Sequence, residues 1–278
     1  MIDPGLQGKI AFITGANNPL GIGAATARAL AHQGCKVAVT FLRLSPEKHG
    51  YQEAEVKQAA APGLPFYHAQ RAKGADELLT AIQSENGVAE ALEIDLTDAA
   101  NIPVLFDWVE STLGPVDILV NNAAHYDPAD TTATFSAEIF DETFAVNARA
   151  TVLLTAEFVR RRVRHGVSWG RVINLSTDAA QAFAGQIAYG ASKAAIEAFT
   201  RSIAIEVGPL GITVNTIAPG PVQSGYISAE FESRLVNEIP LRRIGQPEDI
   251  ADAIVFLASE QANWVTGQVI KVSGGHAL

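Results

Sequence analysis

The chain carries IAFITGANNPLGIG at residues 10–23, an apolar run that enters a glycine-rich turn. The apolar part predicts a buried strand, and the Ala-rich residues 24–33, followed by Gly34, predict a helix. Glycines at such a junction let the backbone approach a pyrophosphate, whose charge meets free amides and the dipole at the helix start. The spacing departs from G-x-G-x-x-G, so the position between a strand and a helix is what favours a nucleotide-binding turn.

Six further runs have the composition of strands, and helical sequence separates most of them. They lie at residues 36–41, 88–94, 116–120, 171–175, 212–217 and 268–272. About seven strands alternating with about six helices predict an α/β fold, a doubly wound parallel sheet with helices on both faces. No composition break marks a linker, so residues 1–278 are expected to form a single domain.

Composition excludes several kinds of partner. The formal charge of −10 and the pI near 5.1 argue against nucleic acids and anionic membranes, which require clustered Lys and Arg. The single cysteine, Cys35, excludes an intramolecular disulfide, and the six histidines show no spacing typical of a metal site. The first residues lack a targeting pattern, and no run of 18 apolar residues occurs. We expect a cytoplasmic enzyme with no metal.

Tyr189 and Lys193 stand four residues apart in a sequence of helical character, and on a helix they share one face. A tyrosine hydroxyl titrates near ~10, and a cation close by favours the phenolate and lowers that pKa. The pair can therefore act as a general acid/base. A half-buried ring beside a solvated amine gives the same spacing, so the rest of the sequence has to decide between the two readings.

The end of the second predicted strand bears on the choice of cofactor. A fold that binds NAD places an acid there against the adenosine ribose, but Phe41 occupies that place. Arg43 follows two residues later and could hold a 2′-phosphate by paired hydrogen bonds, or could be a solvated loop residue. These residues favour NADP(H), with NAD(H) still open.

Polar residues also mark the ends of other predicted elements. Asp95 follows the third strand, where it could bond an adenine amino group, while the Thr97-Asp98 pair could cap the next helix. Asn147 lies within the helix-like residues 137–164, where Asn is a poor helix former. Its presence indicates a buried hydrogen bond or a local irregularity of the helix.

Together these residues resemble the short-chain dehydrogenase/reductase family over nearly the whole chain. The matching motifs, in order, are Thr14-Gly15 with Gly21-Ile22-Gly23, Asp95, Asn121-Asn122-Ala123, Asn147, Ser176-Thr177, Tyr189 with Lys193, Pro219-Gly220, and Thr266-Gly267-Gln268 with Gly274-Gly275. The resemblance implies a Rossmann-type fold and an oxidoreductase that transfers a hydride between a nicotinamide and a ketone or secondary alcohol.

The resemblance also implies roles for individual residues. Tyr189 would exchange the hydroxyl proton, Lys193 would lower its pKa and hold the nicotinamide ribose, Ser176 would steady the carbonyl oxygen, and Asn147 would anchor a water. Dinucleotide contacts are expected at Thr14, Gly15, Asn17, Gly21, Ile22, Gly23, Arg43, Asp95, Leu96, Asn121, Ala123, Tyr189, Lys193, Pro219, Gly220 and Val222. Residues 223–240 would form a lid over the substrate.

Three features depart from the family pattern. Five residues separate Gly15 from Gly21 where the family usually has three, so an extra pair lies within residues 17–20. Residues 44–73 form a longer insertion than usual, expected at the edge of the sheet as an oligomer contact or a long loop. The spacing to Tyr189 selects Ser176 as the carbonyl-binding hydroxyl, whereas the spacing from Asn174 selects Thr177; we favour Ser176 at this point.

The sequence is also compatible with two other functions, and it predicts that several copies of the chain assemble. A 3-oxoacyl-thioester reductase shares the pattern, but its substrate carries an acidic phosphopantetheine arm and the sequence shows no clear basic patch for it. A non-catalytic NADP(H) sensor would need only the binding loops. The helices that carry Asn147 and Tyr189 are apolar beyond one stripe, with Phe158 and Phe199 among the extra residues, which predicts a homotetramer or homodimer.

Overall fold

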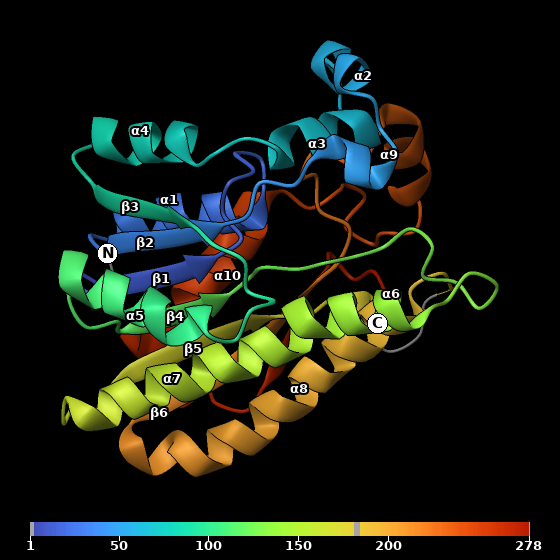
Figure 1. Ribbon diagram of the computed structural model, residues 1–278. Helices are drawn as coiled ribbons and strands as arrows, with labels where there is room; N and C mark the ends of the chain where they lie inside the picture. Colours follow the sequence, from blue (N-terminus) through green and yellow to red (C-terminus); the bar gives the residue numbers. More distant parts are fainter. Residues whose placement is uncertain (1–2, 181–183, 278) are drawn as a thin grey trace.

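The centre of the molecule is one sheet, and Figure 1 shows helices packed around it. The computed structural model describes residues 3–180 and 184–277, and within them the sheet has seven strands, all parallel, in the order β3-β2-β1-β4-β5-β6-β7. They are β1 (Ile10–Thr14), β2 (Lys36–Phe41), β3 (Val88–Glu93), β4 (Ile118–Asn121), β5 (Gly170–Leu175), β6 (Ile212–Pro219) and β7 (Val269–Val272). The order in which strands are added reverses between β1 and β4, which makes the fold doubly wound.

Helices cover both faces of this sheet (Figure 1). One face packs against α1 (Ile22–His32), α4 (Asp76–Ser84) and α10 (Pro247–Ala258). The other packs against α5 (Asn101–Thr112), α7 (Thr151–Arg164) and α8 (Ile187–Val207). The central strands β1, β4, β5 and β6 are buried along their whole length, as a parallel sheet between two helical layers requires. The predicted fold class is therefore confirmed.

Shorter helices complete the fold. They are α2 (Glu53–Gln58), α3 (Leu64–Arg71), α6 (Ala137–Phe144) and α9 (Ala229–Leu235), with one-turn helices at Pro46–His49, Asp178–Ala180, Gly208–Leu210 and Glu260–Ala262. Among the described residues, no helix combines the length and the apolar character needed to cross a membrane.

The insertion at residues 44–73 connects β2 to the edge strand β3 and has helices that the sequence does not predict. It contains α2 and α3, and Figure 1 shows α3 beside α9, above the carboxyl ends of the strands. The backbone amide of Gly63 donates to the carbonyl of Gly225 over 2.9 Å, which joins the insertion to the predicted lid. Helices of six and eight residues are too short to show a hydrophobic period.

The helix-like residues 137–164 form three segments. A π-helix at Ala145–Ala150 separates α6 from α7, and Asn147 lies inside it, completely buried. The sequence offered a buried hydrogen bond or a helix irregularity as reasons for an Asn there, and both occur. Single π turns within α-helices are frequent at functional sites.

Candidate active site

A large hollow opens at the carboxyl ends of the strands. Its volume is about 1930 Å³, and its lining includes Gly15 after β1, Ala123 after β4, Ser176 after β5 and Gly220 after β6. In open α/β sheets ligands bind at this edge, beside the point where the strand order reverses. Small-molecule pockets are usually ~300–1,000 Å³, so this hollow, called the central hollow below, has room for a dinucleotide and a substrate together.

Tyr189 and Lys193 both lie in the first turns of α8 and line the central hollow. The Lys193 ammonium is 5.7 Å from the centre of the Tyr189 ring, and it donates to the carbonyl of Leu175 over 2.8 Å. Burial lowers the pKa of Lys193 to about 8. Burial, and then the nearby hydroxyls of Tyr67 and Tyr226, raise the pKa of Tyr189. In the protein alone, burial therefore outweighs the lowering that a neighbouring cation predicts.

The start of α8 is held by a carboxylate from a distant loop. Asp130 is completely buried, and its two oxygens accept hydrogen bonds from the backbone amides of Ala188 and Tyr189, each over 2.9 Å. The ring of Tyr126, from the same loop, lies edge-on to that of Tyr189 with 5.7 Å between centres. Asp130 thus supplies the negative charge that a helix start favours and fixes the residue that bears the phenol.

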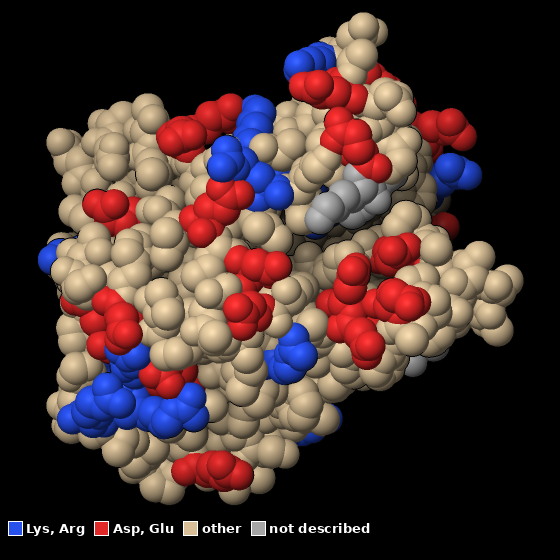
Figure 2. All heavy atoms as spheres, viewed as in Figure 1, with Lys and Arg blue, Asp and Glu red and all other residues tan. Residues whose placement is uncertain are grey.

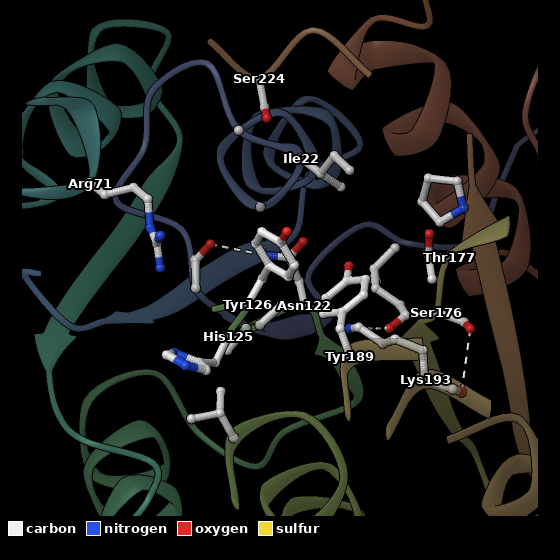
Figure 3. A pocket seen from close by; sticks show the side chains of 18 of the residues that line it. Ile22, Arg71, Asn122, His125, Tyr126, Ser176, Thr177, Tyr189, Lys193 and Ser224 are labelled. Carbon is white, nitrogen blue, oxygen red and sulfur yellow. Dashed lines mark hydrogen bonds between the residues drawn. The ribbon is translucent and has the colours of Figure 1, made fainter. Parts of the chain in front are cut away.

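Ser176 and Thr177 follow β5, and their hydroxyls face different surroundings. Ser176 is buried, and its hydroxyl donates to a carboxylate oxygen of Glu197 over 2.8 Å, with the carbonyl of Lys193 at 3.4 Å. Figure 3 shows the hydroxyls of Thr177 and Tyr189 on the open side of the hollow, whereas Ser176 is directed toward Lys193. Both residues line the hollow, and the Thr177 hydroxyl contacts Oδ1 of Asp178 at 3.4 Å, so the bond of Ser176 to its carboxylate is the shorter of the two.

Asn147 ties the catalytic helix to the loop that follows β4. Its side-chain oxygen accepts from the amide of His125 over 2.7 Å, and its amide group donates to the carbonyl of His125 and to the hydroxyl of Ser192, both over 2.9 Å. The Ser192 hydroxyl in turn donates to the carbonyl of Tyr189 over 2.7 Å. Both amide protons of Asn147 are used, so its side chain fits a positioning role better than the anchoring of a water.

The glycine turn fits a dinucleotide for steric reasons. Gly15 has φ near +72°, and a Cβ there would lie 2.7 Å from the Cα of Ala123. A Cβ on Gly23 would lie 2.5 Å from the carbonyl oxygen of Gly15. Larger residues would push apart the two strand ends and the helix start whose amides meet phosphates.

The expected cofactor residues divide into two sets. Those that line the central hollow are Gly15, Asn17, Gly21, Ile22, Gly23, Asp95, Leu96, Ala123, Tyr189, Lys193, Pro219, Gly220 and Val222. Thr14 and Asn121 lie behind it: the Thr14 hydroxyl accepts from the amides of Asn122 and Ala123, and the Asn121 amide group donates to Asn174 over 2.8 Å. These two residues join neighbouring strands.

Arg43 lies outside the hollow. Its side chain is 60% exposed and pairs with Glu93, with 2.6 Å between Nη2 and Oε2. The guanidinium therefore already has an anionic partner, and the structure does not support the expectation that it holds a 2′-phosphate. The pairing reflects register, because Glu93 ends the neighbouring strand β3 opposite Phe41.

The substrate end of the hollow carries acidic and aromatic side chains. A hydrogen bond of 2.6 Å joins Nδ1 of His276 to Oδ2 of Asp178. The two side chains are 12% and 7% exposed. Figure 2 shows acidic side chains gathered over α6 at the rim, where Asp141 and Glu142 line the hollow. Among the described lining residues there are six carboxylates and three Lys or Arg side chains.

Several of these residues escaped the sequence analysis. The site contains Asp130 from the loop after β4, Tyr67 and Arg71 from the insertion, and His276 from the segment after β7. No local pattern marks them, since each acts on residues far away in the sequence. Among the described residues, no group of three or more His, Cys, Asp or Glu could hold a metal ion.

Comparisons with known proteins agree with this geometry. The family described as "Enoyl-(Acyl carrier protein) reductase" matches residues 47–277. The chain is 38% identical over 271 residues to an uncharacterized oxidoreductase, YjdA, of Bacillus subtilis, covering 97% of each chain. It is 34% identical to NADPH-dependent aldehyde reductase 2 of Arabidopsis thaliana, covering 98% of this chain and 95% of the relative.

A solved structure shares the whole fold. The reductase LugOII, described as catalysing keto-reduction at C1 during lugdunomycin biosynthesis, is 33% identical and superposes with a TM-score of 0.80 over 98% of this chain and 99% of its own. The likeness extends over both the dinucleotide half and the catalytic helix. The chain therefore belongs to the short-chain dehydrogenase/reductase family, and it is an oxidoreductase that acts on carbonyl and alcohol groups.

Proposed function

We propose that the protein is an NADP(H)-dependent ketoreductase that acts on uncharged ketones, with NAD(H) the alternative cofactor. The observation that carries this proposal is the pair of hydroxyls, Tyr189 and Thr177, on one side of the central hollow with the Lys193 ammonium behind the tyrosine. The absence of an acid at Phe41 supports NADP(H), as does the relative described as NADPH-dependent.

Each side chain has a task in this proposal. The dinucleotide, when bound, supplies or accepts the hydride. Tyr189 stays protonated at neutral pH because burial raises its pKa, so it is placed to give a proton to a carbonyl oxygen. Lys193 carries a positive charge below its pKa of about 8 and stabilises the phenolate that this transfer leaves. Thr177 donates to the same oxygen, where negative charge grows in the transition state.

Charge around the hollow bears on the substrate. Six carboxylates against three cationic side chains among the described lining residues disfavour the acidic arm of an acyl-carrier thioester, even though the matching family is described by such a reductase. The phenol rings of Tyr67, Tyr126 and Tyr226 beside Tyr189 give the pocket flat apolar walls with polar tips. Neutral ketones with an apolar body fit this lining.

A turnover experiment tests the proposal. Wild type and Tyr189→Phe are mixed with NADPH or NADH and a panel of neutral ketones, oxoesters, aldehydes and acetoacetyl-CoA, and absorbance of the reduced nicotinamide is followed. We expect turnover of a neutral ketone, and a loss of kcat on the order of 10²-fold or more in Tyr189→Phe with dinucleotide affinity retained. Near-normal kcat in the variant would refute the role of Tyr189.

Other outcomes of this experiment point to the rivals. Tight NADPH binding without turnover of any substrate would favour the sensor. Preference for acetoacetyl-CoA would favour the thioester reductase.

We also propose that the enzyme assembles as a homotetramer or homodimer and works in the cytoplasm. Exposed apolar side chains on the outer helices support the assembly, among them Phe199 and Ile205 on α8 and Phe256 on α10. The acidic charge of the chain supports the location.

A further inference from the structure

Helix α3, the second helix of the insertion, lines the central hollow and is held at both of its ends. At its start, the amide of Gly63 donates to the carbonyl of Gly225, and the rings of Tyr67 and Tyr226 meet edge-on with 6.0 Å between centres. At its end, the side-chain amide of Asn17 donates to the carbonyls of Arg71 and Lys73, both over 2.9 Å. We call α3 with its two anchors the α3 strap.

The anchor at the glycine turn explains an anomaly of the sequence. Asn17 and Asn18 lie in the part of the turn that is two residues longer than the family pattern. Asn17 holds the α3 strap, and the side-chain amide of Asn18 donates to the carbonyl of Ser224 in the lid over 2.9 Å. The extra residues of the glycine turn therefore hold the end of the insertion in place.

Arg71, the last residue of α3, points from the strap into the hollow (Figure 3). Its side chain is half-buried and lines the hollow, and the guanidinium lies 5.2 Å from the centre of the Tyr67 ring. Burial lowers the pKa of His125, Glu142 raises it, and the positive charge of Arg71 lowers it further. Within the part of the chain that the structure describes, no carboxylate pairs with Arg71, in contrast to Arg43 with Glu93.

A half-buried guanidinium without an acceptor is unfavourable, because its N–H donors lose hydrogen bonds to water and form none with protein acceptors. Its backbone is bound to Asn17, two residues after Gly15, where the turn and the start of α1 expose amides to a phosphate. Guanidinium and phosphate form paired, charge-assisted hydrogen bonds of fixed geometry. A phosphate beside the glycine turn would complete the coordination of Arg71.

We propose that Arg71 binds a phosphate of the dinucleotide and that the α3 strap brings it there. This inference rests on the proposed nucleotide-dependent function. The phosphate is either in the pyrophosphate bridge or on the 2′ position of the adenosine ribose, and both chemistries suit a guanidinium.

Dissociation constants of NADPH and NADH, measured by calorimetry for the full-length protein, test the proposal. We expect Arg71→Ala to weaken binding on the order of 10- to 100-fold, the usual effect of losing hydrogen bonds to a charged group. Arg71→Lys should lose less, since the charge stays and the paired geometry goes. Lys73→Ala is the matched control: its ammonium pairs with Glu77, and its removal takes one positive charge from the same segment.

The pattern of losses identifies the phosphate. Equal weakening of NADPH and NADH in Arg71→Ala places the guanidinium on the pyrophosphate, and weakening of NADPH alone places it on the 2′-phosphate; either supports the proposal. Unchanged affinity for both dinucleotides, or an equal loss in Lys73→Ala, overturns it. Thermal unfolding of each variant without ligand checks that the strap remains folded. A wild type that binds neither dinucleotide would instead refute the proposed function.

Discussion

Ser176 and Thr177 are adjacent in the sequence, but their hydroxyls have different neighbours in the structure. Ser176 donates its hydroxyl proton to Glu197 over 2.8 Å in the packing between β5 and α8. The hydroxyl of Thr177 lies on the side of Tyr189 and makes a longer contact of 3.4 Å with Oδ1 of Asp178. We therefore propose Thr177 as the carbonyl-binding hydroxyl, because its bond is the longer one, and Ser176 as a structural one.

Alanine variants separate these roles. Thr177→Ala should lower kcat/KM on the order of 10²-fold, the usual loss for one donor to a developing oxyanion, while Thr177→Ser should recover most of it. Ser176→Ala should leave kcat within a few-fold and reduce the free energy of unfolding by about 1 kcal/mol. Steady-state kinetics and urea unfolding of the three variants decide between the two assignments. A larger kinetic loss in Ser176→Ala than in Thr177→Ala would restore Ser176.

Lys193 links catalysis to stability through its pKa, which burial lowers from 10.5 to about 8. Above pH 8 the native protein releases this proton while the unfolded chain still holds it up to about 10.5. Stability therefore rises with pH in that window. Tyr189 acts in the opposite direction only above about pH 10, where the unfolded chain loses a phenol proton that the native protein keeps.

The increase of stability with pH that the lowered pKa of Lys193 predicts can be measured. Between pH 8 and 9.5, the free energy of unfolding of wild type minus that of Lys193→Met should grow by roughly 1 kcal/mol per pH unit. Urea unfolding at half-unit steps from pH 7 to 9.5 measures the difference, and the variant serves as its own control for all other groups. A difference that stays flat over this range would mean that the lysine keeps an ordinary pKa.

At the scale of elements, the start of α8 determines where the reacting groups lie. A carboxylate 58 residues away in sequence, Asp130, holds the amides of Ala188 and Tyr189, while the π-helix places Asn147 against Ser192 one turn further on. The catalytic helix is therefore fixed from two sides by loops and turns, not by its own cap, since Gln186 makes no side-chain cap.

Removal of this carboxylate should separate positioning from binding. Asp130→Ala should reduce the free energy of unfolding by about 1–3 kcal/mol and lower kcat on the order of 10-fold or more, because small displacements of a reacting group are costly. Asp130→Asn keeps one acceptor and should recover part of both losses. The dissociation constant of NADPH should stay unchanged in both variants. A loss confined to cofactor affinity would contradict a role at the helix start.

At the scale of the whole molecule, the outer helices leave apolar surface uncovered. Phe158 cannot contribute, although the sequence placed it there, because it is completely buried between α7 and the sheet. The exposed residues are instead Phe199 and Ile205 on α8, the latter 80% exposed, and Trp264 near β7, which is 99% exposed. Exposed apolar side chains of this kind fit contacts with further copies of the chain.

A charge placed on one patch tests the assembly. Ile205→Glu should convert a tetramer to a dimer, or a dimer to a monomer, because a carboxylate buried against a second copy would lack a partner. Val104→Glu on α5, at a residue 53% exposed, is the matched control and should leave the assembly unchanged. Sedimentation at micromolar concentration measures both. A single 29.4 kDa species in wild type would refute the assembly outright.

The sequence by itself determined the layout of the chain. Strands rich in Val and Ile between Ala-rich helices have only one good way to bury both faces, so the parallel sheet and the glycine turn after β1 could be predicted. Tyr189 and Lys193 could be predicted too, because their spacing is local to one helix. Such features depend on neighbours within a few residues, which a sequence displays directly.

Only the tertiary structure decided which distant groups meet. The carboxylate partner of Ser176 depended on how β5 packs against α8, and the partner of Arg43 depended on the register of β2 against β3. The α3 strap joins residues more than 50 positions apart, and Asp130 reaches α8 over a similar separation. Contacts of this range leave no periodic trace along the chain, because they are set by packing of the whole fold and not by local conformational preference.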